Sequence, residues 1–123
     1  MRIWAATALF ASGLSGAVGV LSAAAAAHGD GAYLGLISQF TLTSALAYLG
    51  LAWLLQGQFS RMFQAALIAM VVGELLFCGD LAVRLLSGER MFYMAAPTGG
   101  IAMAMGWLFL SVGAVVCAFR KPE

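Results

Sequence analysis

Charged side chains are scarce in this sequence. The 123 residues include 6 Lys and Arg and 5 Asp and Glu, so 9 % of the chain is charged, whereas about a quarter of a soluble domain is. The formal net charge of +1 offers no broad basic surface, which excludes nucleic acid as a partner. With 63 % hydrophobic residues and a mean hydropathy of +0.99, the composition indicates an integral membrane protein that contacts the lipid bilayer.

Cysteine and histidine, the usual ligands of transition metals, are also few. Cys78 and Cys117 lie in separate apolar runs, so they form neither a disulfide framework nor a CxxC motif. The one histidine, His28, cannot build an all-protein metal site with two imidazoles in a single copy of the chain. We therefore expect no metal and no cofactor, with haem ligation by His28 together with another chain as the alternative.

Four apolar runs are each long enough to cross a bilayer, which takes about 20 residues of helix. They cover residues 3–27, 33–55, 62–87 and 97–119. The breaks between them are short and contain glycine and polar residues, which favour turns, and Pro97 suits the start of the last helix. The pattern predicts an all-α integral membrane fold with four transmembrane helices in an up-down-up-down bundle, a single transmembrane domain over residues 1–123.

The first run also imitates a secretory signal peptide, because Arg2 precedes the apolar stretch and small residues, 22–27, end it. Its length is nevertheless sufficient for a span, and we predict that it stays attached. Arg2, Arg61, Arg120 and Lys121 fall at one end of the predicted bundle, against Arg84 and Arg90 at the other. The positive-inside rule then predicts that both termini are cytoplasmic in a bacterial inner membrane.

Small residues recur at spacings that bring helices together in lipid. In the first span Gly16 and Gly19 belong to two such series, and in the fourth span Gly99, Gly106 and Gly113 are seven residues apart, with Gly100 beside the first of them. We expect these six glycines to lie at contacts between helices.

The third run is unusual, since it carries Glu74, Asp80 and Arg84 within an apolar stretch. A charge near the centre of a span costs on the order of 3 kcal/mol or more, so such residues are structural or functional sites. Asp80 and Arg84 are four residues apart, a spacing that permits an ion pair. We expect that pair to be structural, with the binding of an anionic lipid or a partner subunit as the alternative.

Glu74 has no cation nearby along its own helix, because Arg84 lies about 15 Å away at 1.5 Å per residue. Desolvation should favour the protonated acid, which can then bond a hydroxyl of a neighbouring helix. Ser44 and Thr43, near the middle of the second span, are the expected partners. Two alternatives remain open: a cation from another subunit could pair with Glu74, or Glu74 could relay protons or ions.

Several segments resemble one family of small membrane proteins. Ala96-Pro97-Thr98-Gly99-Gly100-Ile101, followed by Gly106-Trp107 and Gly113, is similar to the last span of the domain of unknown function 423 family, relatives of transmembrane protein 256. Ala27-His28 and Phe77-Cys78-Gly79-Asp80-Leu81 also resemble segments of that family. The chain is a divergent member, because Ser44 stands where the family has a histidine and Asp80 where it has a small polar residue. The resemblance implies a fold of four membrane helices and no established activity.

No nucleophile with a neighbouring base, phosphate-binding loop or redox motif occurs in the sequence, so we predict that the chain is not an enzyme. We expect a small accessory or assembly subunit that packs against a larger membrane complex, such as an energy-transducing one. The alternative is a homo-oligomeric transporter or a proton or ion channel with Glu74 at its centre. Its protein partners are accordingly other membrane subunits or copies of itself.

Overall fold

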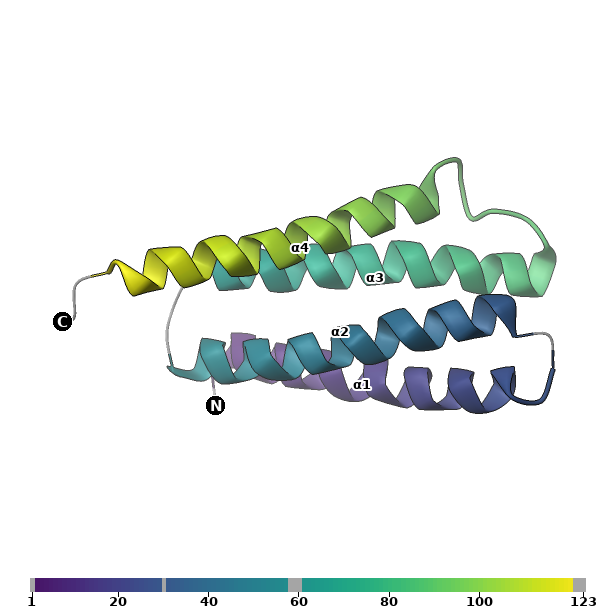
Figure 1. Cartoon of the computed structure of the whole chain (residues 1–123), viewed down its shortest axis with the longest axis horizontal. Helices are drawn as coiled ribbons and strands as arrows, with labels where there is room; N and C mark the ends of the chain where they lie inside the picture. The colour runs from purple at the N-terminus through teal and green to yellow at the C-terminus, as the bar shows by residue number, and fades with distance from the viewer. Residues whose placement is uncertain (1, 30, 58–60, 121–123) are drawn as a thin grey trace.

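Four long helices make up the part of the chain that the computed structural model describes, residues 2–29, 31–57 and 61–120. They are α1 (Ile3–Ala26), α2 (Ala32–Gly57), α3 (Arg61–Ser87) and α4 (Ala95–Ala118), and successive helices run in opposite directions (Figure 1). The predicted all-α membrane fold is confirmed. One boundary differs, because α4 begins two residues before Pro97, whose missing N–H is tolerated in the first turn of a helix.

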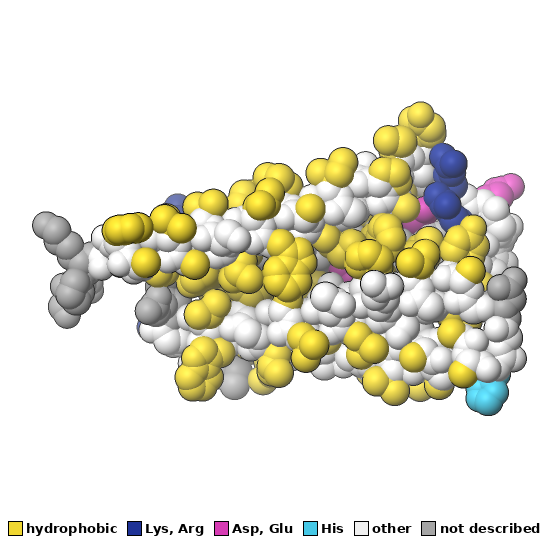
Figure 2. Space-filling model, viewed as in Figure 1, with side chains coloured by type: hydrophobic (Ala, Val, Ile, Leu, Met, Phe, Trp, Pro, Cys, Tyr) yellow, Lys and Arg dark blue, Asp and Glu magenta, His cyan; other side chains and the backbone are white. Residues whose placement is uncertain are grey.

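Each helix is long and apolar enough to cross a membrane. With 24 to 27 residues, the helices are roughly 36 to 40 Å long, more than the ~30 Å of a bilayer core. α1, α2 and α4 contain no Asp, Glu, Lys or Arg. Figure 2 shows hydrophobic side chains along the whole length of the bundle, with the basic side chains towards its ends. This distribution is that of a protein surrounded by lipid.

The helices form two hairpins that meet along one seam. α1 packs against α2 and α3 packs against α4, and the hairpins join chiefly where α2 contacts α3. Among the described residues, the α4 backbone approaches neither α1 nor α2 closely. The bundle is therefore open on the two sides that flank the seam.

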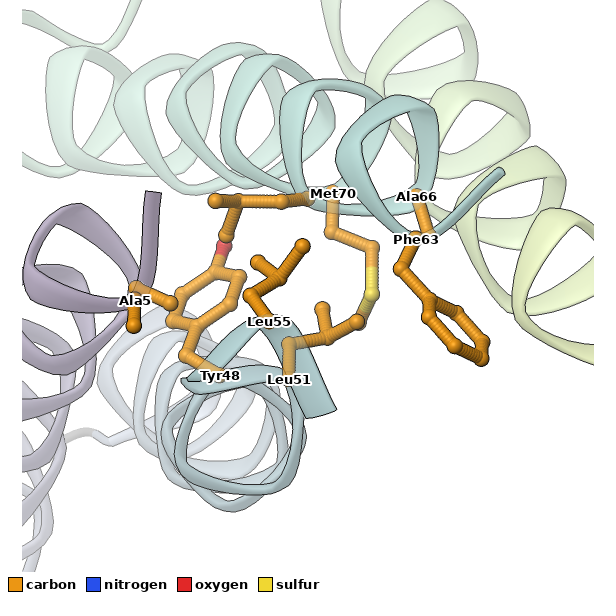
Figure 3. Packing of buried hydrophobic residues seen from close by; sticks show 9 residues of the cluster. Ala5, Tyr48, Leu51, Leu55, Phe63, Ala66 and Met70 are labelled. Atoms are coloured by element: carbon orange, nitrogen blue, oxygen red, sulfur yellow. The ribbon is translucent and has the colours of Figure 1, made fainter. Parts of the chain in front are cut away.

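The apolar core occupies one half of this seam. It contains Ala5 and Ala8 of α1, Tyr48, Leu51 and Leu55 of α2, and Phe63, Ala66, Leu67 and Met70 of α3. Figure 3 shows Leu51 and Leu55 of α2 facing Met70 of α3. Because the residues of α2 and α3 come from the second half of α2 and the first half of α3, they hold the two hairpins together towards the end of α2 and the start of α3.

Glycines on α3 and α4 let these two helices approach each other closely. A Cβ added at Gly99 would lie 2.5 Å from the backbone N of Phe77, and one added at Gly73 would lie 2.6 Å from the carbonyl oxygen of Gly99. Gly106 faces Met70 and Gly113 faces the ring of Phe63 at similarly short range. A side chain at Gly73 or Gly99 would meet backbone atoms and push the helices apart, and one at Gly106 or Gly113 would displace the side chain that faces it.

Three other predicted packing glycines differ in their surroundings. Gly19 of α1 contacts Thr41 and Leu42 of α2 so closely that an added Cβ would lie 2.5 Å from Leu42 Cγ. At Gly16 a Cβ would make an ordinary contact with Ala45, 3.8 Å away, and at Gly100 it would meet nothing within 4 Å. Gly100 therefore makes no contact with another helix within the described residues, because successive helical residues are about 100° apart and its neighbour Gly99 is the one that faces α3.

Asp80 fixes the connection between α3 and α4. Its side chain is fully buried, and its Oδ1 accepts a hydrogen bond from the backbone N–H of Met91 at 2.8 Å. Its Oδ2 lies 3.0 Å from Nη2 of Arg84, so the expected ion pair is present. The chain enters α4 through Met94, whose φ of 66° is left-handed. The carboxylate thus holds the loop that precedes α4 against the end of α3.

We predict that Gly106→Leu destabilises the purified protein by about 1–3 kcal/mol or more, the usual cost of forcing extra methylenes into a packed contact. Thermal unfolding in a mild detergent measures this. Gly100→Leu is the matched control and should unfold at or above the wild-type temperature, since nothing lies within 4 Å of that position and leucine favours a helix more than glycine does. Equal melting temperatures for the two variants would contradict the assigned contact of Gly106 with α3.

We predict that Asp80→Ala frees the α3–α4 connection while the helices persist. A hydrogen bond to a charged group is worth about 1.5–3 kcal/mol, so hydrogen exchange of the Met91 amide should become roughly 10- to 100-fold faster. Exchange mass spectrometry of a peptide covering residues 88–94 provides the readout. Glu89→Ala, at an exposed position of the same loop, should leave that exchange unchanged, and an unaffected rate in Asp80→Ala would show that another contact holds the loop.

Candidate functional site

The carboxyl group of Glu74 is the meeting point of three helices. Glu74 is the fourteenth of the 27 residues of α3, and its side chain is buried. The Ser15 hydroxyl of α1 donates to Oε1 at 2.7 Å and to Oε2 at 3.1 Å. The Tyr48 hydroxyl of α2 donates to Oε2 at 2.5 Å, and Figure 3 shows the Tyr48 ring pointing from α2 towards α3. We call these three residues the Glu74 cluster.

Helical periodicity explains why these side chains converge. Ser15 belongs to the buried stripe of α1 with Ala8 and Gly19, at spacings of seven and four residues, and this stripe faces α2. Tyr48 continues the buried stripe of α2 through Ser44 and Leu51. Ser15 and Glu74 lie near the middle of α1 and α3, and Tyr48 lies on the inward face of α2. The cluster therefore forms near the centre of the membrane span.

The partners of Glu74 differ from those predicted. Ser44 is buried one helical turn from Tyr48, but no hydrogen bond joins its side chain to Glu74 within the described residues. Thr43 is exposed, and its hydroxyl donates to the carbonyl oxygen of Gln39 at 2.7 Å. The prediction of Ser44 and Thr43 considered only their depth along the span. The rotation of α2 about its axis and the length of the tyrosine side chain decide which residue bonds Glu74.

Ser15 and Tyr48 are the site residues that sequence reasoning missed. Ser15 was visible as a small residue four positions before Gly19, and this spacing indicated a packing face without indicating its hydrogen bond. Tyr48 is a polar aromatic residue within an apolar run, and such residues find a hydrogen-bond partner when they are buried. That principle, applied to Tyr48, is the signal that could have identified it.

A groove with a volume of about 510 Å³ lies beside the cluster, between α1 and α3. Buried Ser15 and Glu74 form its floor, and exposed apolar side chains form its rim. The rim includes Phe10, Leu14 and Val18 from α1 and Leu75 from α3. Its mouth faces the surrounding bilayer, because α1 and α3 approach each other closely at few points.

A second groove, of about 390 Å³, lies between α2 and α4 on the other side of the seam. Thr43, Leu46, Gly50, Trp107 and Leu110 are among its lining residues. Among the described residues that line it there is no acid, base or buried polar side chain. This groove therefore offers shape and apolar surface, whereas the α1/α3 groove also offers hydrogen bonding.

The remaining predicted site residues lie away from the cluster. Asp80 and Arg84 are six and ten residues beyond Glu74, about 9 and 15 Å along α3, where they hold the α3–α4 connection. Arg84 is 24 % exposed, so its guanidinium is only partly covered. His28 is exposed in the turn after α1 and donates its backbone N–H to the carbonyl oxygen of Ala25. Within the described ranges no three His, Cys, Asp or Glu side chains lie together as metal ligands would.

Comparison with known proteins places this architecture in a family. The sequence profile of the family described as "Protein of unknown function (DUF423)" matches residues 15–100, a stretch that contains Ser15, Tyr48 and Glu74. No solved structure matches significantly.

The curated relatives include the "UPF0382 inner membrane protein YgdD" of Escherichia coli K12 and the protein of the same name from Shigella flexneri. Each is 36 % identical over 70 residues, which cover 57 % of this chain and 53 % of the relative. The match thus spans about half the length of these relatives. Since the family profile extends over more than half of the 123 residues, this chain belongs to the DUF423 family of membrane proteins.

Proposed function

We propose that this protein is a non-enzymatic accessory subunit of a bacterial inner membrane complex, which receives a partner helix on the outer face of α4. The proposal rests on small residues that the chain does not use internally. Gly100 has no atom within 4 Å of an added Cβ, and Ala104, four residues later, is exposed on the same helix. This four-residue spacing of small residues is a common feature of contacts between membrane helices.

The cost of glycine supports this interpretation. A glycine inside a helix is about 1 kcal/mol less favourable than alanine, and Gly99, Gly106 and Gly113 offset that cost through their contacts with α3. Gly100 makes no such contact within the chain, and a lipid-facing position is served equally well by leucine or valine. A neighbouring helix at Gly100 and Ala104 would use the space that their small side chains leave.

The hydrogen bonds of Glu74 bear on the alternative of a proton or ion channel. A relay needs a succession of proton-exchanging groups along the span, but within the described residues the side-chain bonds of Glu74 extend only to the neighbouring hydroxyls of Ser15 and Tyr48. These hydroxyls also occupy the carboxyl oxygens that a cation from another subunit, the other alternative, would pair with. Among the described residues no specific contact favours a channel, and the accessory role is therefore the function that we propose.

The orientation in the membrane is part of the proposal. Arg2 and Arg120 flank the free ends of α1 and α4, and Arg61 begins α3 at the same end of the bundle. Lys121 adds to this side but lies outside the described residues. Arg84 and Arg90 lie at the opposite end, so the excess of basic residues favours cytoplasmic termini.

We predict that Gly100→Leu and Ala104→Leu reduce recovery of a stoichiometric partner in a pulldown from native membranes by about tenfold. Added bulk at either position separates backbones that small residues allow to meet. Val116→Leu, at an exposed position on another side of α4, is the control and should retain the partner. Recovery of copies of this chain alone would reject the accessory role and favour a homo-oligomer.

We predict that a cysteine at position 89 reacts with a membrane-impermeant maleimide in intact cells, whereas one at position 122 reacts only after permeabilisation. Cys78 and Cys117 are first replaced by alanine so that each variant carries one thiol. The expected pattern follows from cytoplasmic termini and an external α3–α4 connection. Labelling of position 122 from outside intact cells would reverse the proposed orientation.

A further inference from the structure

The α3–α4 connection folds back along the end of α3. Gly99 of α4 packs against Phe77 of α3, where an added Cβ would lie 2.5 Å from the Phe77 backbone N. The two helices are antiparallel, so the start of α4 at Ala95 lies opposite Leu81, about six residues or 9 Å before α3 ends at Ser87. Figure 1 shows α3 continuing past the first turn of α4. The connection therefore returns towards the centre of the bundle.

Arg84 lies where the hydrocarbon core of the bilayer ends. It is about 15 Å along α3 from Glu74, which lies near the centre of the span, and half of a ~30 Å core is the same distance. Its Nη2 lies 3.0 Å from Oδ2 of Asp80, one helical turn closer to the centre. This contact keeps the guanidinium from extending outward into water, so its exposed part faces lipid at the level where the headgroups begin.

Both arginines of this region retain N–H donors that no described residue uses. A guanidinium has five, and Arg84 contacts Asp80 through Nη2, while its Nε is buried without a hydrogen-bond partner. Arg90 is exposed, and no ion pair or side-chain hydrogen bond joins it to another described residue. Figure 2 shows Lys or Arg side chains at the end of the bundle where the α3–α4 connection lies. The free donors call for an acceptor from the surroundings.

The charges of this region balance, which restricts the kind of acceptor. Asp80 and Glu89 equal the two arginines in number, so the long-range attraction of a soluble anion is weak. Short-range donation from the guanidinium groups remains, and it suits the two unesterified oxygens of a phosphate diester. Phospholipids present this group at the level of Arg84 in large excess, so a site with little net charge can still be filled.

The side chains next to these donors are apolar and exposed. Phe92 is 47 % exposed and Tyr93 is 81 % exposed, and Met91 and Met94 are exposed as well. Tyrosine, which has an apolar ring and a polar end, is typical of membrane interfaces. These side chains suit the glycerol esters and the first methylenes of a lipid, whereas free phosphate would leave them in water. The occupant that fits both the donors and the apolar side chains is a phospholipid.

We propose that the α3–α4 connection binds a phospholipid of the adjacent leaflet. Arg84 and Arg90 donate to the unesterified oxygens of its phosphate, and the rings of Phe92 and Tyr93 contact its glycerol esters and upper acyl chains. Asp80 positions the site, because its carboxylate holds the guanidinium and the connection at once. The outer face of α4 takes no part, so the inference does not rest on the proposed accessory role.

The test adds dioleoylphosphatidylglycerol to the purified full chain in dodecyl maltoside, a detergent without phosphate. Dioleoylglycerol has the same chains but no phosphate, and sodium phosphate has the anion but no chains. We expect the phospholipid to raise the unfolding temperature saturably, as a ligand of the folded state must. The other two compounds should have no saturable effect at equal concentrations.

A pair of exposed arginines locates the site. Arg90→Gln should weaken the binding of dioleoylphosphatidylglycerol about tenfold or more, the loss expected from one hydrogen bond to a charged group. Arg61→Gln, at an exposed position at the other end of α3, is the control and should keep the wild-type affinity. Arg84 is left in place, because its loss would leave the buried charge of Asp80 unpaired.

Four results would overturn the inference. Absence of a saturable shift with the phospholipid would show that the connection holds no lipid. An equal shift with dioleoylglycerol would show that acyl chains are recognised without the phosphate, and a saturable shift with sodium phosphate would identify a site for a soluble anion instead. Equal affinities of Arg90→Gln and Arg61→Gln would place the lipid elsewhere on the protein.

Discussion

A carboxyl group at the centre of a bilayer has no water to bond, so the protein must supply its donors. In this chain Ser15 and Tyr48 perform that role for Glu74 at 2.7 and 2.5 Å. These bonds set the rotation of α1, α2 and α3 about their own axes, because each side chain must point at the same carboxyl. The other contacts of the seam, Leu51 and Leu55 against Met70, are non-directional and can accommodate the rotation that the polar bonds require.

The glycines of α4 lie on two different faces of the helix. Gly99, Gly106 and Gly113 face α3, and their absent side chains allow the backbones to meet. Gly100 lies next to Gly99 in the sequence but faces outward, where no other part of the described chain reaches it. One helix therefore combines a face that is already used within the chain with a face that remains available to a second protein.

Much of this architecture could be predicted from the sequence, because the thickness and low polarity of the bilayer restrict the length and composition of a membrane helix. The four helices follow from the apolar runs, and the Asp80–Arg84 pair follows from its four-residue spacing. The bonds of Glu74 could not be predicted, since they depend on how α1 and α2 rotate against α3, which composition does not encode. The outward position of Gly100 could not be predicted for a related reason, because adjacent glycines point about 100° apart and only the packed helices show which of them faces inward.

The order of the cluster residues in the chain matters during synthesis. Proteins emerge from the ribosome with the N-terminal part first, so Ser15 and Tyr48 enter the membrane before Glu74 does. The donors are thus already in place, on a completed α1–α2 hairpin, when the acid arrives with α3. A chain interrupted after the first hairpin would leave two hydroxyls in the bilayer, which can bond carbonyls of their own helices. The reverse order would expose an unbonded carboxyl to lipid while its partners were still being made.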